Sequence, residues 1–167
     1  MRRRDLLLGG AGLIGLAGLL EWLPVSSKAG AETFEVVKSE AEWKRALTPE
    51  QFSVLRQHAT ERPFSSALNE EHRRGAFHCA GCDLPVFRSD TKFDSGTGWP
   101  SFYAPIDGAV ATSNDSSFFI RRTEVHCRRC GGHLDHVFDD GPPPTGKRYC
   151  MNGAALKFEA GAASGPA

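Results

Sequence analysis

Between residues 39 and 59, polar and apolar positions recur with helical spacing. Ser39 is followed by Glu42, and Thr48 by Gln51, and each pair has the spacing of a capping box at the start of a helix. The apolar positions of the second segment share one helical face, and they are Phe52, Leu55 and Ala59. These signals predict two short helices, the first continuing through Leu47 and the second beginning after Thr48.

After Pro63 the pattern changes to short apolar runs that are rich in strand-forming residues. Clusters of Gly, Pro, Asn, Asp and Ser separate four such runs: Leu84–Phe87, Phe118–Val125, Leu134–Phe138 and Ala154–Phe158. Short runs between turn-forming clusters are typical of antiparallel sheets. The chain is therefore predicted to be mainly β, with short N-terminal helices. Residues 159–167, which are rich in Ala, Gly and Ser, are predicted to be a flexible tail.

The first 31 residues have the organisation of an export signal. Three arginines, Arg2 to Arg4, precede an uncharged, glycine-rich apolar run from Leu8 to Leu20, and Ala29-Gly30-Ala31 is a small-residue cleavage pattern. Consecutive arginines before a mildly apolar segment resemble a bacterial twin-arginine signal. We therefore predict a twin-arginine-type signal peptide over residues 1–31 and a domain over residues 32–158. We expect a periplasmic or secreted protein, with an uncleaved membrane anchor as the alternative.

The charge balance narrows the possible partners. The chain has 20 basic and 20 acidic residues. The predicted signal holds four basic and two acidic residues, so the remainder has 16 and 18 and a formal charge of −2. A nucleic-acid binder needs a basic surface to neutralise phosphates. We therefore expect no nucleic-acid partner, and we expect a monomer.

Four of the five cysteines form two C-x-x-C pairs, Cys79 with Cys82 and Cys127 with Cys130, with 44 residues between the pairs. A C-x-x-C turn places two thiolates on one side of a tight loop, and two such turns can complete a tetrahedral sulfur site for one structural zinc ion. Two disulfides, or one redox dithiol, are the alternatives in an exported protein. The spacing predicts that the pairs lie on separate hairpins.

The fifth cysteine, Cys150, is left over. It could be a buried core residue, a common position for cysteine. However, in a strand Arg148, Cys150 and Asn152 would share one face, because side chains alternate every residue. A guanidinium beside a thiol favours the nucleophilic thiolate. The residues around Cys150 therefore favour a catalytic nucleophile.

Four segments together are similar to the B-type methionine-R-sulfoxide reductases. They are residues 92–102 (KFDSGTGWPSF), Cys127-x-x-Cys130-Gly131, residues 133–142 (HLDHVFDDGP) and residues 148–152 (RYCMN). The resemblance covers about residues 40–158, and the four segments occur in the family's order. It implies two antiparallel sheets in a β-tent-like arrangement, clamped by a structural zinc ion on the four paired cysteines.

The resemblance also implies an activity, the reduction of the R epimer of methionine sulfoxide, mainly in proteins. The Cys150 thiolate would attack the sulfoxide sulfur and end as a sulfenic acid. His136 would donate the proton to the oxygen, with His133 and Asp140 orienting the network, because histidine titrates near neutrality.

The remaining site residues follow from the same resemblance. Trp99, with Phe102 in the same motif, would hold the substrate's methyl group, and Arg148 and Asn152 would tune and position Cys150. Each residue taken by itself has a simpler interpretation. Trp99 could be core packing, the histidines ordinary, and residues 139–142 a turn.

The sequence departs from the family pattern at two positions. Many members carry a resolving cysteine where this chain has Thr97, which cannot form a disulfide. The sulfenic acid is therefore expected to react with an external reductant, either a thioredoxin-like protein or a small thiol. Asp135 replaces a common glycine between the two histidines, with an open effect. A zinc-clamped β module without turnover, or a thiol redox sensor, are the alternatives to a repair enzyme.

Overall fold

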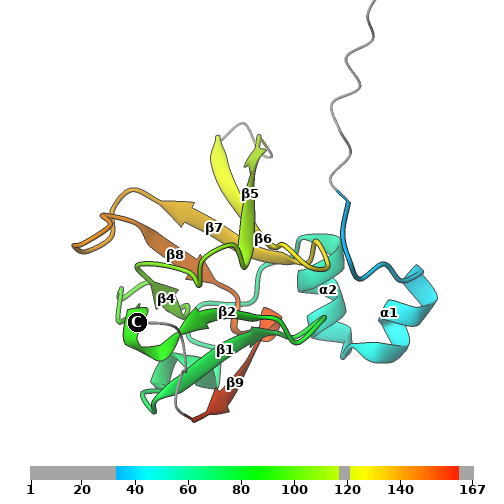
Figure 1. The fold of residues 1–167 in the computed structure, drawn as a ribbon, viewed down its shortest axis with the longest axis horizontal. Helices are drawn as coiled ribbons and strands as arrows, with labels where there is room; N and C mark the ends of the chain where they lie inside the picture. Colours follow the sequence, from blue (N-terminus) through cyan, green and yellow to red (C-terminus); the bar gives the residue numbers. More distant parts are fainter. Residues whose placement is uncertain (1–32, 117–120, 162–167) are drawn as a thin grey trace, which may run out of the picture. The chain divides into compact units, whose positions relative to one another are not determined.

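The computed structural model describes residues 33–116 and 121–161 (Figure 1). The predicted signal peptide and the end of the predicted tail lie outside these residues. Within the described part of the chain, no helix is both long and apolar enough to cross a membrane.

The two predicted helices are present, and each begins with its capping box. Helix α1 covers Glu40–Ala46 and α2 covers Pro49–Gln57, with Ser39 and Thr48 as their N-caps. In each box the N-cap side chain accepts the backbone N–H of the third helical residue. The side chain of that residue accepts the backbone N–H of the N-cap in return. His58 ends α2 in a left-handed conformation, φ 57°. Ala59 therefore lies beyond the helix and does not extend its apolar face as predicted.

A small antiparallel sheet has the strand order β2–β1–β9. Its strands are β1 (Gly75–Cys79), β2 (Pro85–Arg88) and β9 (Leu156–Ala160). The predicted strand at 154–158 is shifted, because the 3₁₀ helix η4 covers Gly153–Ala155. The tail was predicted to begin at 159, which is wrong for two residues, because Ala160 pairs with Gly75 and Glu159 with Ala76 in the ladder between β9 and β1.

A second antiparallel sheet has six strands in the order β3–β4–β8–β7–β6–β5. They are β3 (Lys92–Phe93), β4 (Ser101–Phe102), β5 (Val110–Asp115), β6 (Arg122–Cys127), β7 (His133–Phe138) and β8 (Arg148–Met151). Two further 3₁₀ helices, η1 (Ala67–Glu70) and η2 (Ser89–Thr91), lie in the connections. The prediction of a mainly β fold with two antiparallel sheets is confirmed.

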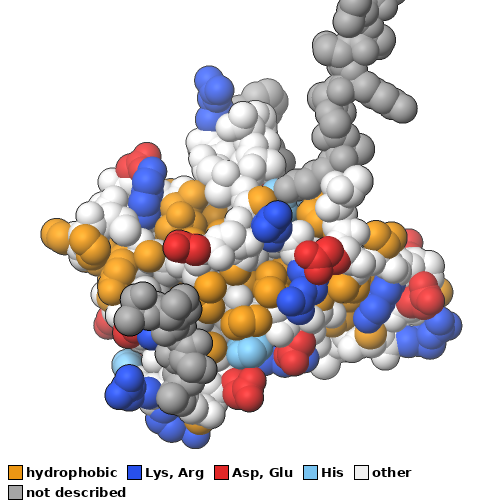
Figure 2. Space-filling view, in the orientation of Figure 1, with side chains coloured by type: hydrophobic (Ala, Val, Ile, Leu, Met, Phe, Trp, Pro, Cys, Tyr) orange, Lys and Arg blue, Asp and Glu red, His pale blue; other side chains and the backbone are white. Residues whose placement is uncertain are grey.

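Aromatic side chains join the two sheets. Phe102 of β4 stacks on Phe87 of β2 with 4.4 Å between ring centroids, and it meets Phe77 of β1 edge-on at 4.9 Å. All three side chains are fully buried. Helix α2 covers another part of this core, where it packs on β7 and η4 (Figure 1). On the face in Figure 2, acidic and basic side chains are interspersed.

Candidate active site and metal centre

The four paired cysteines come together between the two sheets. Cys79 and Cys82 lie at the turn between β1 and β2, whereas Cys127 and Cys130 lie at the turn between β6 and β7. Their sulfur atoms all lie within 4.8 Å of one another. One hairpin belongs to each sheet, so an ion bound here would clamp the sheets together, as the spacing predicted.

The sulfur separations fit a tetrahedral metal site. The Sγ atoms of Cys79 and Cys130 are 3.7 Å apart, and those of Cys82 and Cys127 are 3.4 Å apart. Tetrahedral zinc with Zn–S bonds of about 2.3 Å places its sulfurs about 3.8 Å apart, whereas a disulfide needs about 2.05 Å. All four cysteines are free in the structure. The cluster therefore matches a metal site and does not match two disulfides.

Cys150 lies in the middle of the large sheet. In the strand register it is directly opposite Ser101 of β4 on one side and His136 of β7 on the other. Its side chain is 6% exposed, and its sulfur is 3.7 Å from the Thr97 hydroxyl. Directly opposite residues on one face of a sheet contact each other. The register thus brings the predicted nucleophile beside the predicted acid.

The pKa of the Cys150 thiol is higher than usual, so the thiol ionises less readily than an ordinary cysteine. Burial is the largest effect and raises its pKa, and the nearby Asp135 carboxylate raises it further. Hydrogen bonding from Thr97 and the charge of Arg148 act in the opposite direction. Arg148 therefore favours the thiolate, as the sequence suggested, but burial outweighs it.

Arg148 is held by Asp140. Its Nε and a terminal nitrogen donate to the two carboxylate oxygens at 2.9 and 2.8 Å, and its guanidinium lies over the Phe138 ring. This bond lowers the pKa of Asp140. Asp140 was predicted to orient the histidine network, whereas its carboxylate bonds Arg148. Its contribution to the site therefore runs through the guanidinium.

His136 is bonded at both ring nitrogens. Nδ1 lies 2.6 Å from Asp135 Oδ1, and Nε2 lies 2.8 Å from Asp115 Oδ2. Burial disfavours the charged ring, but the hydrogen bonds to the two carboxylates outweigh it and raise the pKa of His136. Asp135 has φ 145°, a conformation that glycine adopts more easily. With this irregular backbone, the Asp135 carboxylate reaches the imidazole of the next residue in the strand.

His133 is oriented by Glu124, a residue that the sequence analysis did not select. Its Nδ1 lies 2.7 Å from Glu124 Oε1, and His58 Nδ1 lies 3.1 Å from the same oxygen. The hydrogen bonds to His133 and Ser113 outweigh burial and lower the pKa of Glu124 to about 2. His133 Nε2 is buried and has no hydrogen-bond partner among the described residues. That nitrogen can accept or donate a bond to a small bound group.

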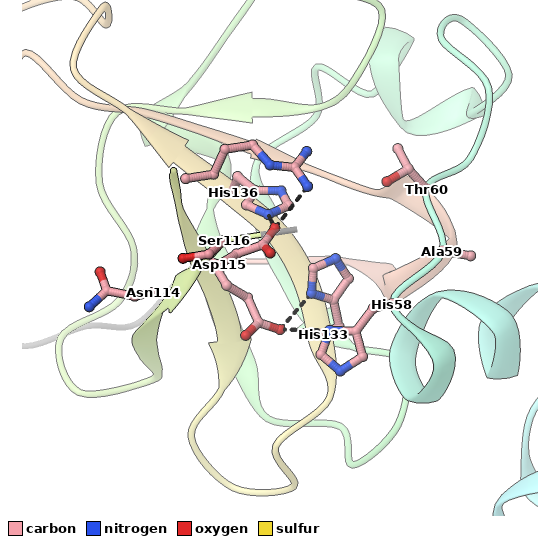
Figure 3. Close-up of a pocket in the computed structure, with 10 residues that line it drawn as sticks. His58, Ala59, Thr60, Asn114, Asp115, Ser116, His133 and His136 are labelled. Atoms are coloured by element: carbon pink, nitrogen blue, oxygen red, sulfur yellow. Dashed lines mark hydrogen bonds and ion pairs between the residues drawn. The ribbon is translucent and has the colours of Figure 1, made fainter. Parts of the chain in front are cut away.

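These polar side chains line a cleft of about 800 Å³ (Figure 3). Figure 3 shows His133 and His136 on one wall with Asp115 beside His136, and His58 entering from the end of α2. Thr60 and Ala59 line the opposite side. The cleft gives a ligand access to the imidazoles from the outside of the sheet.

Trp99 and Asn152 are joined through one residue, Glu61. Trp99 Nε1 donates to the Glu61 carbonyl at 3.2 Å, and the Glu61 N–H donates to Asn152 Oδ1 at 2.9 Å. The Glu61 carboxylate accepts the N–H groups of Gly153 and Ala154 at 2.7 and 2.8 Å. This residue therefore links the indole to the segment that follows Cys150.

Two predicted positions differ from the expectation. Strand β8 ends at Met151, so Asn152 does not continue the face of Cys150, and its fully buried amide also donates to the Leu134 carbonyl. Phe102 lies in the aromatic core with no exposed surface, so direct substrate contact does not fit its position. Trp99 is half-buried and lines a small cavity of about 200 Å³ with Phe64 and Lys92.

The fold and the site define a class: a two-sheet β protein with a four-cysteine cluster and one further cysteine paired in the sheet with a histidine. The chain belongs to the SelR domain family, whose model matches residues 47–160. It is 54% identical over 126 residues to the peptide methionine sulfoxide reductase MsrB of Agrobacterium fabrum, which covers 75% of this chain and 93% of that protein.

Relatives from other lineages are equally similar. The peptide methionine sulfoxide reductase MsrB of Methanosarcina barkeri is 58% identical over 125 residues, 74% of this chain and 88% of that protein. The chloroplastic peptide methionine sulfoxide reductase B1 of Arabidopsis thaliana is 56% identical over 123 residues, 73% of this chain and 61% of that protein. The family predicted from the sequence motifs is confirmed.

Proposed function

We propose that this chain reduces the R epimer of methionine sulfoxide in oxidised proteins and peptides, with Cys150 as the reacting thiol. Membership of the SelR family and the names of its close relatives support this activity. The single observation that carries the assignment of Cys150 is its register. Strand pairing places it directly opposite His136 in β7, while the other four cysteines are gathered in the metal centre.

The reaction requires a nucleophilic sulfur and a proton for the departing oxygen. The Cys150 thiolate attacks the sulfoxide sulfur, the imidazolium of His136 protonates the oxygen, and the oxygen ends on the cysteine as a sulfenic acid. Methionine sulfoxide is thereby reduced by two electrons to methionine, and Cys150 is oxidised by two electrons. Because burial raises the pKa of the Cys150 thiol, the thiolate forms most readily when a neighbouring base can accept the thiol proton.

The charged groups around the two reacting residues have distinct tasks in this proposal. Arg148, held by Asp140, stabilises the thiolate. Glu124 keeps the His133 ring in one orientation, with its Nε2 available to the substrate oxygen or to water. Trp99 supplies an apolar wall for the methyl group, worth about 0.3–1.5 kcal/mol as a sulfur–aromatic contact.

Recycling of Cys150 needs an external thiol. The Thr97 hydroxyl lies 3.7 Å from the sulfur, and threonine cannot form a disulfide. A thioredoxin-like protein or small thiol would condense with the sulfenic acid, releasing water, and a second thiol would free Cys150 by forming the reductant's own disulfide.

The metal centre is proposed to hold one structural zinc ion. Four thiolate ligands leave no open coordination position, so the ion would hold the two hairpins in place and take no part in the chemistry. The donor set and the sulfur separations support this proposal.

The first 31 residues are proposed to direct export by a twin-arginine-type route to the periplasm or beyond. The arginine run and the apolar segment support this proposal. That route transports folded proteins, so zinc could be loaded in a reducing cytoplasm before export. Mass measurement of the protein recovered from the periplasm would show whether residues 1–31 have been removed.

The decisive test of the activity is Cys150→Ser measured against both epimers. The wild-type protein, with dithiothreitol as donor, is expected to reduce the R epimer and spare the S epimer. The variant should keep its metal and its melting temperature but lose all turnover. Normal turnover in Cys150→Ser would contradict the role of Cys150, and absence of turnover in the wild type would favour a binding module. Equal reaction with peroxide would favour a redox sensor.

A further inference from the structure

We propose that Asp135 is a positioning residue of this site, whose carboxylate holds His136 as the charged acid and opposes ionisation of Cys150. It would thereby set the pH range in which the two residues are both in their reactive forms. This inference rests on the proposed function, because it concerns the same two residues.

The first observation is the position of the carboxylate. Asp135 Oδ1 lies 2.6 Å from His136 Nδ1, and the Asp135 side chain is only 10% exposed. A buried carboxylate that accepts a bond from an imidazole stabilises the imidazolium. His136 in turn is directly opposite Cys150, so the same negative charge lies close to the sulfur and disfavours the thiolate.

The second observation is the backbone. Asp135 has φ 145° in the middle of β7, a region that is unfavourable for residues with a side chain. Outliers of this kind persist where surrounding interactions determine them, and they cluster at functional sites. Here the bond to His136 is the interaction that a glycine at this position could not make.

Charged and titratable groups from β5, β6 and β8 surround His136. Asp115 from β5 bonds Nε2 and also accepts from Arg122 of β6 at 2.8 Å. The positive charge of Arg122 opposes protonation of the ring. Glu124 of β6 is opposite His136 in the register, and it bonds His133. Cys150 of β8 is opposite His136 on the other side of β7. Among these groups, Asp135 is the carboxylate that raises the pKa of both Cys150 and His136.

The consequence is a shift of both limbs of the pH–rate profile in the same direction. One limb reports ionisation of Cys150 and the other reports loss of the proton from His136. Removing the negative charge of Asp135 lowers the pKa of both groups, so both limbs should move to lower pH by about one unit. A purely structural defect would lower the rate without moving either limb.

The experiment compares Asp135→Asn and Asp135→Gly with two matched variants. Asp115→Asn removes the other carboxylate on His136 and should move mainly the limb that reports His136, because Asp115 bonds Nε2 of that ring. Asp139→Asn removes an exposed charge that is paired with Lys147 just after the end of β7, and it should move neither limb. Melting temperatures identify any variant that fails to fold, and glycine suits φ 145° if asparagine does not.

Two measurements separate failure of this proposal from failure of the proposed function. The pH dependence of Cys150 alkylation, followed by peptide mass spectrometry, and the titration of the His136 ring by NMR need no turnover. Both midpoints should fall in the Asp135 variants. Unchanged midpoints would overturn the role of Asp135 even in an active enzyme, whereas shifted midpoints in a protein without reductase activity would contradict only the proposed reaction.

Discussion

The Thr97 hydroxyl lies 3.7 Å from the Cys150 sulfur, where a second thiol could capture an oxidised Cys150. Thr97 is in turn bonded to Ser95 at 2.8 Å, and Ser95 to Ser101 at 2.7 Å. The reactive sulfur thus adjoins a chain of hydroxyl groups that can donate hydrogen bonds but cannot reduce a sulfenic acid. This arrangement supports the proposal that an external reductant recycles Cys150.

Replacing Thr97 with cysteine should change the oxidised product. After one equivalent of methionine-R-sulfoxide, the wild-type protein should carry a sulfenic acid on Cys150, trapped as a dimedone adduct. Thr97→Cys should instead lose two hydrogens and react with no dimedone, because a thiol at this distance condenses with the sulfenic acid. Intact-mass and peptide mass spectrometry distinguish the two products.

Thr97→Ser is the matched control, because it keeps the hydroxyl and adds no thiol. It should behave as the wild type does and give the dimedone adduct. An internal disulfide in the wild-type protein, for example to a cysteine of the metal centre, would contradict an external recycling route.

Glu124 should stabilise the fold above pH 4.5 and lose this effect in acid. Its pKa is lowered to about 2, mainly by the hydrogen bond to His133. A lowered folded-state pKa contributes stability above the unfolded value near 4.3, and the contribution disappears as the pH falls through the folded value. Glu124→Gln should therefore lower the free energy of unfolding by on the order of 2 kcal/mol at pH 7. Urea unfolding at pH 7, 4 and 2.5 measures this difference.

The difference between wild type and Glu124→Gln should shrink toward zero as the pH falls through about 2, because the wild-type carboxylate becomes protonated there. Glu35→Gln, at an exposed carboxylate, controls for general charge removal and should show little difference at any pH. A Glu124→Gln effect that is constant with pH would show that the carboxylate acts through packing and not through its charge.

Removing the metal should loosen the connection between the two sheets. One zinc ion per chain is expected by elemental analysis, and a chelator that removes it should lower the melting temperature strongly, because metal binding free energy is also folding free energy. Cys82→Ser should have the same effect, whereas Cys150→Ser should retain the ion. Full stability without metal would mean that the cysteine cluster is held by the rest of the fold.

Features that depend on nearby residues could be predicted from the sequence. The caps of α1 and α2 involve residues three positions apart, and each C-x-x-C turn sets the positions of two sulfurs by itself. The four-cysteine site followed, because two such turns fit one tetrahedral ion. The residues around Cys150 marked it as a nucleophile, and the family motifs added His136. The strand register places the two directly opposite each other.

Features that depend on distant pairings could not be predicted in this way. Glu61 and Asn152 are 91 positions apart in the chain, and Glu61 shows no local pattern that marks it as a buried carboxylate. Phe102 looked like part of the substrate site because it follows Trp99 closely, but β4 turns its ring toward Phe87 in the core. Asp115 and Glu124 reach the histidines only through the pairing of β5, β6 and β7.

Replacing Glu61 with alanine should damage the site from a distance. The change removes the acceptor for the N–H groups of Gly153 and Ala154, and unsatisfied buried donors cost about 1–3 kcal/mol each. The free energy of unfolding should fall by at least that much, and kcat should fall because the segment after Cys150 is no longer held. Glu61→Gln keeps one acceptor oxygen, so it should retain part of the stability and part of kcat. Unchanged kcat in a folded Glu61→Ala protein would mean that Trp99 and Asn152 are positioned without this carboxylate.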